Sequence, residues 1–378
     1  MNRDFQYYLP VNLIFGVGKV ELLGAETAKY GRKALLVTGK GSTKRTGLLD
    51  RALSLLAEEG VEVSVFDKVT PNPITDTVYE GVAAARDFGA EVVIALGGGS
   101  IIDCSKAIAF AFFNDGDIFD YIYGLKQGDK GLPLIAVPTT CGTGSEGNCF
   151  AVLTNTENND KKSLRNIVSV PKASIIDPQL MTTMPNSVAA SVMFDALCHS
   201  MEAYISKSSQ PLVEMQALYA MKLMSENMRS ALKDHEDMDA WSSVTLASTL
   251  GGMCINVAGV AAPHGMEHPA SGLRNIVHGR GLAALSPVIY HETLEYAPEK
   301  FGKISRILGG KGAADFEEQL NMLLNDIELK TSLSKEGIEE SDIDWMVKNC
   351  LKVSAASMNA HPKVFSEEEI RDLYYKAL

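Results

Sequence analysis

The chain has 378 residues, 46% of them hydrophobic, and this length favours two domains around a large core. Its formal net charge of −12 comes without a basic run, so neither nucleic acid nor an anionic membrane is an expected partner. No apolar stretch reaches the roughly 18 residues of a membrane span, and no signal peptide is expected at the N-terminus. The six scattered cysteines form no CxxC pair, which favours a reducing, cytoplasmic location.

The first half of the chain alternates short apolar runs with amphipathic segments. A strand and turn over 11–20 lead into a helix, and further strands are predicted at 33–38, 61–67, 91–96 and 132–137, with helices at 47–60, 75–88 and 101–112. This alternation is typical of a doubly wound α/β domain with a mainly parallel sheet. Loops rich in Gly and Thr follow several strands, where open α/β sheets bind ligands.

The second half has helical periodicity without clear strand signals. Helices are predicted at 187–206, 211–233, 237–258, 280–295, 297–308 and 313–326, followed by a tail rich in Glu and Lys. We therefore predict an α/β domain over 1–182 and an all-α domain over 183–378.

Five of the seven histidines lie between Phe194 and His278. Asp195 and His199 are four residues apart in a helical segment, so both project from one face, and His264 and His268 repeat that spacing. A single histidine on a helix is more often structural than a ligand, but this clustering favours a metal site. The candidate metal ligands are Asp195, His199, His264 and His278. Three imidazoles and one carboxylate suit a borderline divalent ion such as Zn²⁺ or Fe²⁺.

A second candidate site is the turn Gly97-Gly98-Gly99-Ser100, which joins a predicted strand to a predicted helix. Glycines let the backbone approach a phosphate, and the helix N-terminus adds unpaired N–H groups and a partial positive charge. Many Gly-rich turns bind nothing, and this one is not the GxGxxG fingerprint of an ordinary Rossmann fold.

Together these segments resemble the iron-containing (group III) alcohol dehydrogenases, a family that includes lactaldehyde/propanediol and butanol dehydrogenases. The segment 195–202, the pair His264 and His268, and the dipeptide His278-Gly279 fill the family's ligand positions. The family's GGGS-x-x-D-x-x-K motif matches 97–106, and its Pro-Thr-Thr-x-Gly-Thr-Gly-Ser-Glu motif matches 138–146. The resemblance runs almost from end to end.

The resemblance implies a dehydroquinate synthase-like architecture, in which a nucleotide-binding α/β domain joins a helical metal domain. It implies reversible NAD(P)-dependent oxidation of a small primary alcohol or diol, or reduction of a short aldehyde. Fe²⁺ is the expected metal, with Zn²⁺ as the alternative. His268 is the candidate proton relay, with a structural role as its alternative, and a homodimer or larger homo-oligomer is expected.

The same resemblance implies the cofactor contacts. The GGGS loop takes the pyrophosphate, Asn72 lies by the adenosine, the Thr-rich loop lines the nicotinamide side, and Lys161 or Lys162 approaches the ribose. The full set of implied cofactor-binding residues is Gly39, Ser42, Asn72, Gly97, Gly98, Gly99, Ser100, Asp103, Thr139, Thr140, Thr143, Val152, Lys161 and Leu180.

Two departures from the family pattern bear on specificity. Gly39 stands where NAD-selective members often have an Asp, and basic residues follow it, which favours NADP(H) while leaving NAD open. Arg274 and Arg280 flank the last metal-ligand motif. If either points into the cleft it could hold an anionic aldehyde, but a surface or interface role is the alternative.

Three other readings stay open at this point. The chain could be a related metal enzyme such as a glycerol dehydrogenase or dehydroquinate synthase. It could also be like maleylacetate reductase, which shares the fold without a metal, although the complete ligand set argues against that. The third reading is a non-catalytic module that keeps the fold.

Overall fold

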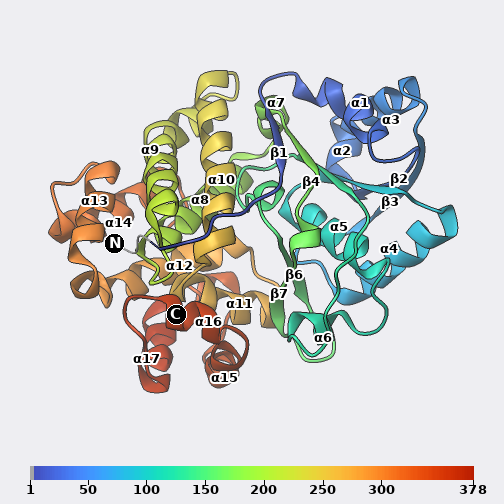
Figure 1. Ribbon diagram of the computed structural model, residues 1–378. Helices are drawn as coiled ribbons and strands as arrows, with labels where there is room; N and C mark the ends of the chain where they lie inside the picture. The colour runs from blue at the N-terminus through green and yellow to red at the C-terminus, as the bar shows by residue number, and fades with distance from the viewer. Residues whose placement is uncertain (1–3) are drawn as a thin grey trace.

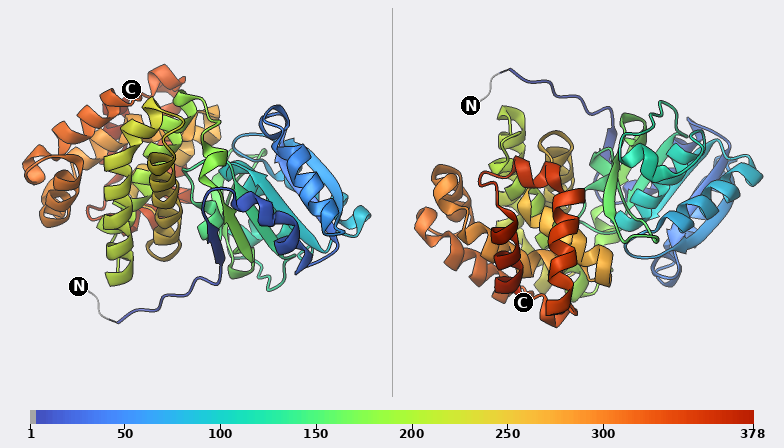
Figure 2. Two further views of the ribbon diagram at one scale, coloured as in Figure 1. Left: turned by 90° about the horizontal axis from the view of Figure 1, so that it is seen from above. Right: turned by 90° about the horizontal axis from the view of Figure 1, so that it is seen from below.

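The computed structural model describes residues 4–378 as a sheet-containing half and a helical half that lie side by side (Figures 1 and 2). In the first half, six parallel strands form one sheet in the order β1-β8-β5-β4-β2-β3. The strands are β1 (Asn12–Phe15), β2 (Lys33–Gly39), β3 (Glu62–Val69), β4 (Val92–Gly97), β5 (Leu134–Pro138) and β8 (Ala173–Ile176). The predicted parallel sheet is confirmed.

Helices cover both faces of this sheet, which explains why its central strands are continuous apolar runs. Leu35 and its neighbours pack with α4 (Thr75–Phe88) and α5 (Gly99–Ala111), whereas Leu36 faces α1 (Leu23–Ala28) and α3 (Leu48–Glu58). The short helices of this half are α2 (Ser42–Arg45), α6 (Ile118–Ile122) and α7 (Pro178–Met181).

An antiparallel hairpin, β6 (Phe150–Thr154) and β7 (Lys161–Arg165), was not predicted. The sequence of β7, KKSLR, carries little strand propensity because lysine is depleted in strands. The hairpin forms through its burial, since Ala151, Leu153 and Leu164 pack into the core beside α5. Tertiary packing thus overrides local propensity here.

The second half is a helical bundle built around α8 (Asn186–Ile205), which is buried on almost every side by its neighbours. The other helices are α9 (Pro211–Lys233), α10 (Met238–Ala258), α11 (Ala262–Arg274), α12 (His278–His291), α13 (Pro298–Leu308), α14 (Phe316–Asp326), α15 (Ile343–Val353), α16 (Ala355–Ala360) and α17 (Glu367–Ala377).

The helix predicted over 280–295 has different ends, because α12 already begins at His278 and a separate 3₁₀ turn covers Leu294–Tyr296. The predicted division between residues 182 and 183 falls in the stretch between α7 and α8. Over residues 4–378, no single helix has both the length and the apolarity to cross a membrane; only the sharply bent pair α10 and α11 meets those two criteria together.

His361 is a fully buried histidine near the C-terminus. Its Nε2 lies 2.8 Å from Thr293 Oγ1, and its Nδ1 accepts a hydrogen bond from the Ala262 N–H. Burial, together with the charge of Lys207, lowers the pKa of His361 to about 3. Between pH 6.5 and about 3, His361 binds a proton in the unfolded chain but not in the folded chain. The free energy of unfolding therefore falls as the pH falls through this range.

We therefore expect His361→Asn to reduce the acid sensitivity of the fold. Relative to the variant, the parent chain should lose about 1.4 kcal/mol of unfolding free energy for each pH unit between pH 6 and 4. Urea unfolding of both proteins across this range measures the difference. If the free energy of unfolding changes with pH in the same way for both proteins, His361 is not the source of the acid sensitivity.

Candidate active site

One cavity of ≈ 680 Å³ is lined by residues of both halves. The sheet half contributes the start of α5, the loop before β6, and the hairpin, while α8, α10, α11, α12 and the α15–α16 segment close the other side. Most of the residues that the sequence singled out for chemistry meet in this cavity. They include Ser100, Asp103, Thr143, Asp195, His199, His264, His268 and His278.

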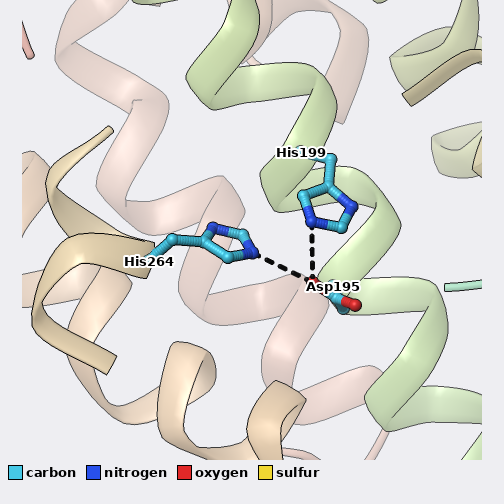
Figure 3. Close-up of side chains that lie close together, drawn as sticks. All are labelled: Asp195, His199 and His264. Carbon is cyan, nitrogen blue, oxygen red and sulfur yellow. Dashed lines mark hydrogen bonds and ion pairs between the residues drawn. The ribbon is translucent and has the colours of Figure 1, made fainter. Parts of the chain in front are cut away.

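The candidate metal ligands converge on one carboxylate oxygen. Asp195 Oδ1 lies 3.4 Å from His199 Nε2, 3.2 Å from His264 Nε2 and 3.7 Å from His278 Nε2. Figure 3 shows Asp195 and His199 on one helix, α8, with His264 reaching toward them from α11. The donor atoms of these three residues lie within 4.8 Å of one another. His278, at the start of α12, completes the set, so all four candidates belong to the helical half.

These separations fit a tetrahedral metal site. An ion held at about 2.1 Å by each donor would keep neighbouring donor atoms about 3.4 Å apart. The three Asp195 distances bracket that value. The donor set, three imidazoles and one carboxylate, suits a borderline divalent cation. The four residues can therefore hold such an ion with little rearrangement.

Two buried glutamates orient two of the imidazoles. Glu202 on α8 lies 2.6 Å from His264 Nδ1 and also accepts from the Ala261 N–H. Glu267 pairs in the same way with Nδ1 of His278. Each contact leaves Nε2 facing Asp195, which is the arrangement by which outer carboxylates fix a metal-binding histidine. The sequence reasoning missed this role, although Glu202 lies three residues after His199.

His199 is held differently. Its Nδ1 has no hydrogen-bond partner among residues 4–378, and its ring instead stacks on His264 with the ring centroids 4.6 Å apart. Burial lowers the pKa of His199 to about 4, so this imidazole is neutral at neutral pH and its Nε2 lone pair is available. For His264, burial opposes the charge, but Glu202 and Asp195 outweigh it and raise the pKa to about 10.

Burial also opposes the charge of Asp195, yet the surrounding imidazoles, His199 first, hold the pKa of this carboxyl well below its usual range. The site is thus built to keep a negative charge at its centre. A cation placed between these groups replaces the proton that His264 carries in its absence.

His268 lies one helical turn after His264 and lines the same cavity. Its ring stacks near His278 with the ring centroids 5.7 Å apart, and it makes no hydrogen bond within the described part of the chain. Burial and the charge of Lys161 lower the pKa of His268 well below its usual value. It is therefore a neutral imidazole at the cavity wall, with both nitrogens available to a ligand.

The Gly-rich turn packs directly against the Thr-rich loop. A Cβ on Gly99 would lie 2.3 Å from Thr143 Cγ2, and one on Gly98 would lie 3.0 Å from Thr140 Oγ1. Only glycine fits at Gly99 without moving its neighbour. The helix that follows, α5, points its N-terminus at the cavity through Ser100.

The predicted cofactor residues fall into two groups. Those that line the cavity are Asn72, Ser100, Asp103, Thr143, Val152 and Lys161. Asn72 accepts from Lys161 Nζ at 3.0 Å and donates to Asn275 of the helical half. Those outside the cavity wall are Gly39, Ser42, Gly97, Gly98, Gly99, Thr139, Thr140 and Leu180.

Gly39 ends β2, and the basic residues after it lie in or beside α2. Lys44 is paired with Asp67 on the neighbouring strand β3. Lys40 and Arg45 make no ion pair within residues 4–378. The end of β2 therefore carries two unpaired cations and no carboxylate of its own.

Lys106 is a fully buried cation one turn beyond Asp103 on α5. Four acceptors of the segment 145–150 lie 2.6 to 3.0 Å from its ammonium nitrogen and share its three N–H groups: Ser145 O, Ser145 Oγ, Asn148 Oδ1 and Phe150 O. Asp103 in turn accepts from Ser145 Oγ and from the Val152 N–H. This network fixes the loop that lines the cavity between the Thr-rich segment and the hairpin.

Of the two roles considered for Arg274 and Arg280, the structure agrees with the surface or interface role and not with a substrate contact. Arg274 makes a two-pronged contact with Asp342, and Arg280 makes one with Glu336. Neither arginine lines the cavity. Through Nε and Nη2, both guanidinium groups tie α11 and α12 to the C-terminal segment, outside the cavity.

We expect Glu202→Gln to weaken metal binding by roughly 10- to 100-fold, because an amide cannot supply the charge that holds the His264 tautomer. Glu267→Gln should give a similar loss through His278. Competition with a chelator of known affinity measures the change. Unaltered metal affinity in both variants would show that packing alone orients the rings, and Glu317→Gln, beside the exposed His291, serves as the matched control.

Comparison with known proteins gives consistent matches over the whole chain. The family profile described as "Iron-containing alcohol dehydrogenase" matches residues 10–178, and "Fe-containing alcohol dehydrogenase family, C-terminal" matches residues 189–378. The chain is 35% identical to 1,3-propanediol dehydrogenase of Klebsiella pneumoniae, over 99% of both chains. It is 33% identical to NADH-dependent butanol dehydrogenase B of Clostridium acetobutylicum, over 96% of this chain and 97% of that relative.

Solved structures agree with these matches. A crystal structure of an archaeal halo-thermophilic alcohol dehydrogenase from a Red Sea brine pool covers 100% of both chains with a TM-score of 0.95 and 32% identity. A crystal structure of 1,3-propanediol oxidoreductase also covers 100% of both chains, with a TM-score of 0.92 and 34% identity.

Proposed function

The chain belongs to the iron-containing alcohol dehydrogenase family, and from that membership we propose that its cavity is the active site of an NAD(P)-linked enzyme that interconverts short aldehydes and primary alcohols or diols. The observation that carries the proposal is the convergence of Asp195, His199, His264 and His278 in a cavity that also contains the start of α5. We propose that these four residues hold Fe²⁺, with Zn²⁺ as the alternative.

When bound, the metal polarises the carbon–oxygen bond of the substrate, and the nicotinamide accepts or supplies the hydride. The side chains of the protein position the reacting groups and transfer the proton. Asp195 and the three imidazoles would hold the metal. His268, a neutral imidazole at the same wall, accepts the alcohol proton at a ring nitrogen or returns it to the product of reduction.

The shape and polarity of the cavity support a small substrate. The cavity that contains the metal ligands is also lined by short or medium apolar side chains, among them Ile255, Val257, Val260 and Ala360. These side chains exclude water from the reacting carbon and leave room for a short carbon chain. The named relatives, which act on 1,3-propanediol and butanol, support the same size class.

For the nucleotide, we propose that the enzyme accepts NADP(H) as well as NAD(H). Gly39 offers no carboxylate that would repel a 2′-phosphate, and Lys40 and Arg45 follow it without an ion-pair partner among residues 4–378. The named butanol dehydrogenase relative is NADH-dependent, which supports retained use of NAD(H).

The direct test is an anaerobic assay of the metal-free protein after loading with Fe²⁺ or Zn²⁺. Acetaldehyde, butanal and 3-hydroxypropanal are offered with NADH and with NADPH. We expect oxidation of the reduced nucleotide only in the metal-loaded protein, and higher turnover with Fe²⁺. Turnover that does not depend on metal, or none with any aldehyde, would exclude the proposed function.

We also propose that the enzyme is a cytoplasmic homo-oligomer. All six cysteines are free, which fits a reducing compartment. On α9, Leu212, Met215 and Tyr219 are 38%, 61% and 52% exposed and share one face of the helix. We expect Met215→Lys with Tyr219→Lys to shift the sedimentation coefficient toward that of the monomer, whereas Lys222→Ala nearby should not.

A further inference from the structure

The hairpin β6–β7 presents one face to the core and the other to the cavity. Successive side chains of a strand point to opposite faces, and Ala151, Leu153 and Leu164 occupy the core face. The cavity face carries Phe150, Val152, Lys161, Ser163 and Arg165, and all five line the cavity. An arginine therefore stands on the wall of the active site at the end of β7.

Arg165 is paired across the hairpin with Phe150 and lies over its ring, with the guanidinium carbon 4.5 Å from the ring centroid. Within residues 4–378 it makes no hydrogen bond and no ion pair, in contrast to Arg274 and Arg280. Stacking on an aromatic ring fixes the plane of a guanidinium and leaves its N–H edge available for a planar or tetrahedral anion.

The charges around Arg165 favour an anion. The carboxylates that line the cavity are Asp103 and Asp195, and Asp103 already accepts hydrogen bonds from Ser145 and Val152. Lys162 lies on the opposite face of β7 from Arg165 but also reaches the cavity, where its ammonium donates to the Val353 carbonyl. Burial, followed by the charge of the nearby Arg165, lowers the pKa of Lys162. This end of the cavity has an excess of positive charge although the whole chain carries −12.

The position of this end relative to the metal ligands follows from α10. Gly251 packs against His199, since a Cβ there would lie 3.4 Å from His199 Cβ. Asn256, five residues further along α10, accepts from the N–H of Cys149, which directly precedes Phe150. Five residues of helix span about 7.5 Å, so α10 contacts the metal-ligand helix at one point and the strand that begins with Phe150 at another, further along its axis.

We propose that Arg165 is a substrate-specificity residue, which binds the carboxylate or sulfonate of a short aldehyde whose carbonyl end lies at the metal ligands. The inference rests on the proposed function and narrows its substrate class to ω-anionic aldehydes and the corresponding hydroxy acids. Phe150 positions Arg165, and the apolar wall of α10 accommodates the carbon chain between the two ends.

The test compares anionic aldehydes with neutral aldehydes of equal carbon number in the metal-loaded enzyme. The pairs are glyoxylate with acetaldehyde, succinic semialdehyde with butanal, and 5-oxopentanoate with pentanal. We expect the parent enzyme to prefer the anionic member of at least one of the two longer pairs. Arg165→Gln should lower kcat/KM for that substrate by roughly 10- to 100-fold and leave its neutral counterpart within about twofold. For the same anionic substrate, the kcat/KM of Arg165→Lys should lie between those of the parent enzyme and Arg165→Gln. Lysine keeps the positive charge but cannot donate two parallel hydrogen bonds to a carboxylate or sulfonate.

Arg280→Gln is the matched control, since it removes an arginine outside the cavity and should leave the selectivity unchanged. Retained butanal turnover in Arg165→Gln shows that the variant is folded. An equal loss for both members of a pair, or a raised KM for NADH or NADPH with unchanged selectivity, overturns the inference while leaving the proposed function intact. Absence of turnover with every aldehyde in the parent enzyme overturns both.

Discussion

Asp195→Asn is expected to lower kcat/KM for aldehyde reduction by at least about 10³-fold, the largest effect of any single substitution considered. The change preserves shape but removes the charge on which His199, His264 and His278 converge. An amide oxygen is a weak ligand for a borderline cation, and the amide NH₂ group would face imidazole nitrogens. We therefore expect loss of bound metal together with loss of turnover.

Metal content by mass spectrometry and steady-state rates on the same sample test this expectation together. His291→Ala is the control, since it removes an exposed histidine that pairs only with Glu317. A variant at Asp195 that keeps its metal and its turnover would remove the basis of the redox assignment. Loss of turnover with full metal retention would instead show that the carboxylate acts on the substrate rather than on the ion.

The second large effect is expected for stability. Lys106→Met should lower the free energy of unfolding of the sheet half by about 3–5 kcal/mol, because it leaves Asp103 as a buried charge without its cationic neighbour. It also leaves four acceptors of the 145–150 segment without their donor. Burial lowers the pKa of Lys106 to about 8, so the side chain is predominantly charged at neutral pH.

Urea unfolding of the metal-free protein measures the loss, and Lys68→Met is the control. Lys68 pairs with Glu80 at the exposed surface, where an ion pair contributes at most about 1 kcal/mol. Because Lys106 fixes the loop between Thr143 and the hairpin, we also expect a raised KM for the nucleotide. An unfolding midpoint for Lys106→Met equal to that of Lys68→Met would show that the buried network contributes no net stability.

The parts of the structure that follow from local pattern could be predicted. The apolar runs of β2, β4 and β5 and the helical periodicity of α8, α9 and α10 indicated the two halves. The spacing of Asp195 and His199, one turn of a buried helix, indicated two side chains that the structure does bring together. Spacing within one element constrains geometry strongly, and these predictions needed little else.

What could not be predicted depends on contacts between distant segments. The choice between the two roles of Arg274 and Arg280 could not be made from the sequence, because their partners, Asp342 and Glu336, lie 68 and 56 residues further along the chain. The hairpin was not predicted because the sequence of β7 is polar, and the strand forms only through its packing on the core. Arg165, on that same strand, could be recognised only once the cavity was known. The contact of Glu267 with His278 could not be predicted either, because the two residues belong to different helices.

All four candidate metal ligands come from one half of the molecule, whereas the Gly-rich turn and the hairpin come from the other. Loss of the metal therefore need not alter the Gly-rich turn and the hairpin, where the nucleotide is expected to bind. A molecule that has lost its bound metal should therefore still bind the dinucleotide without turning it over. Resupply of the divalent metal alone should then restore its turnover.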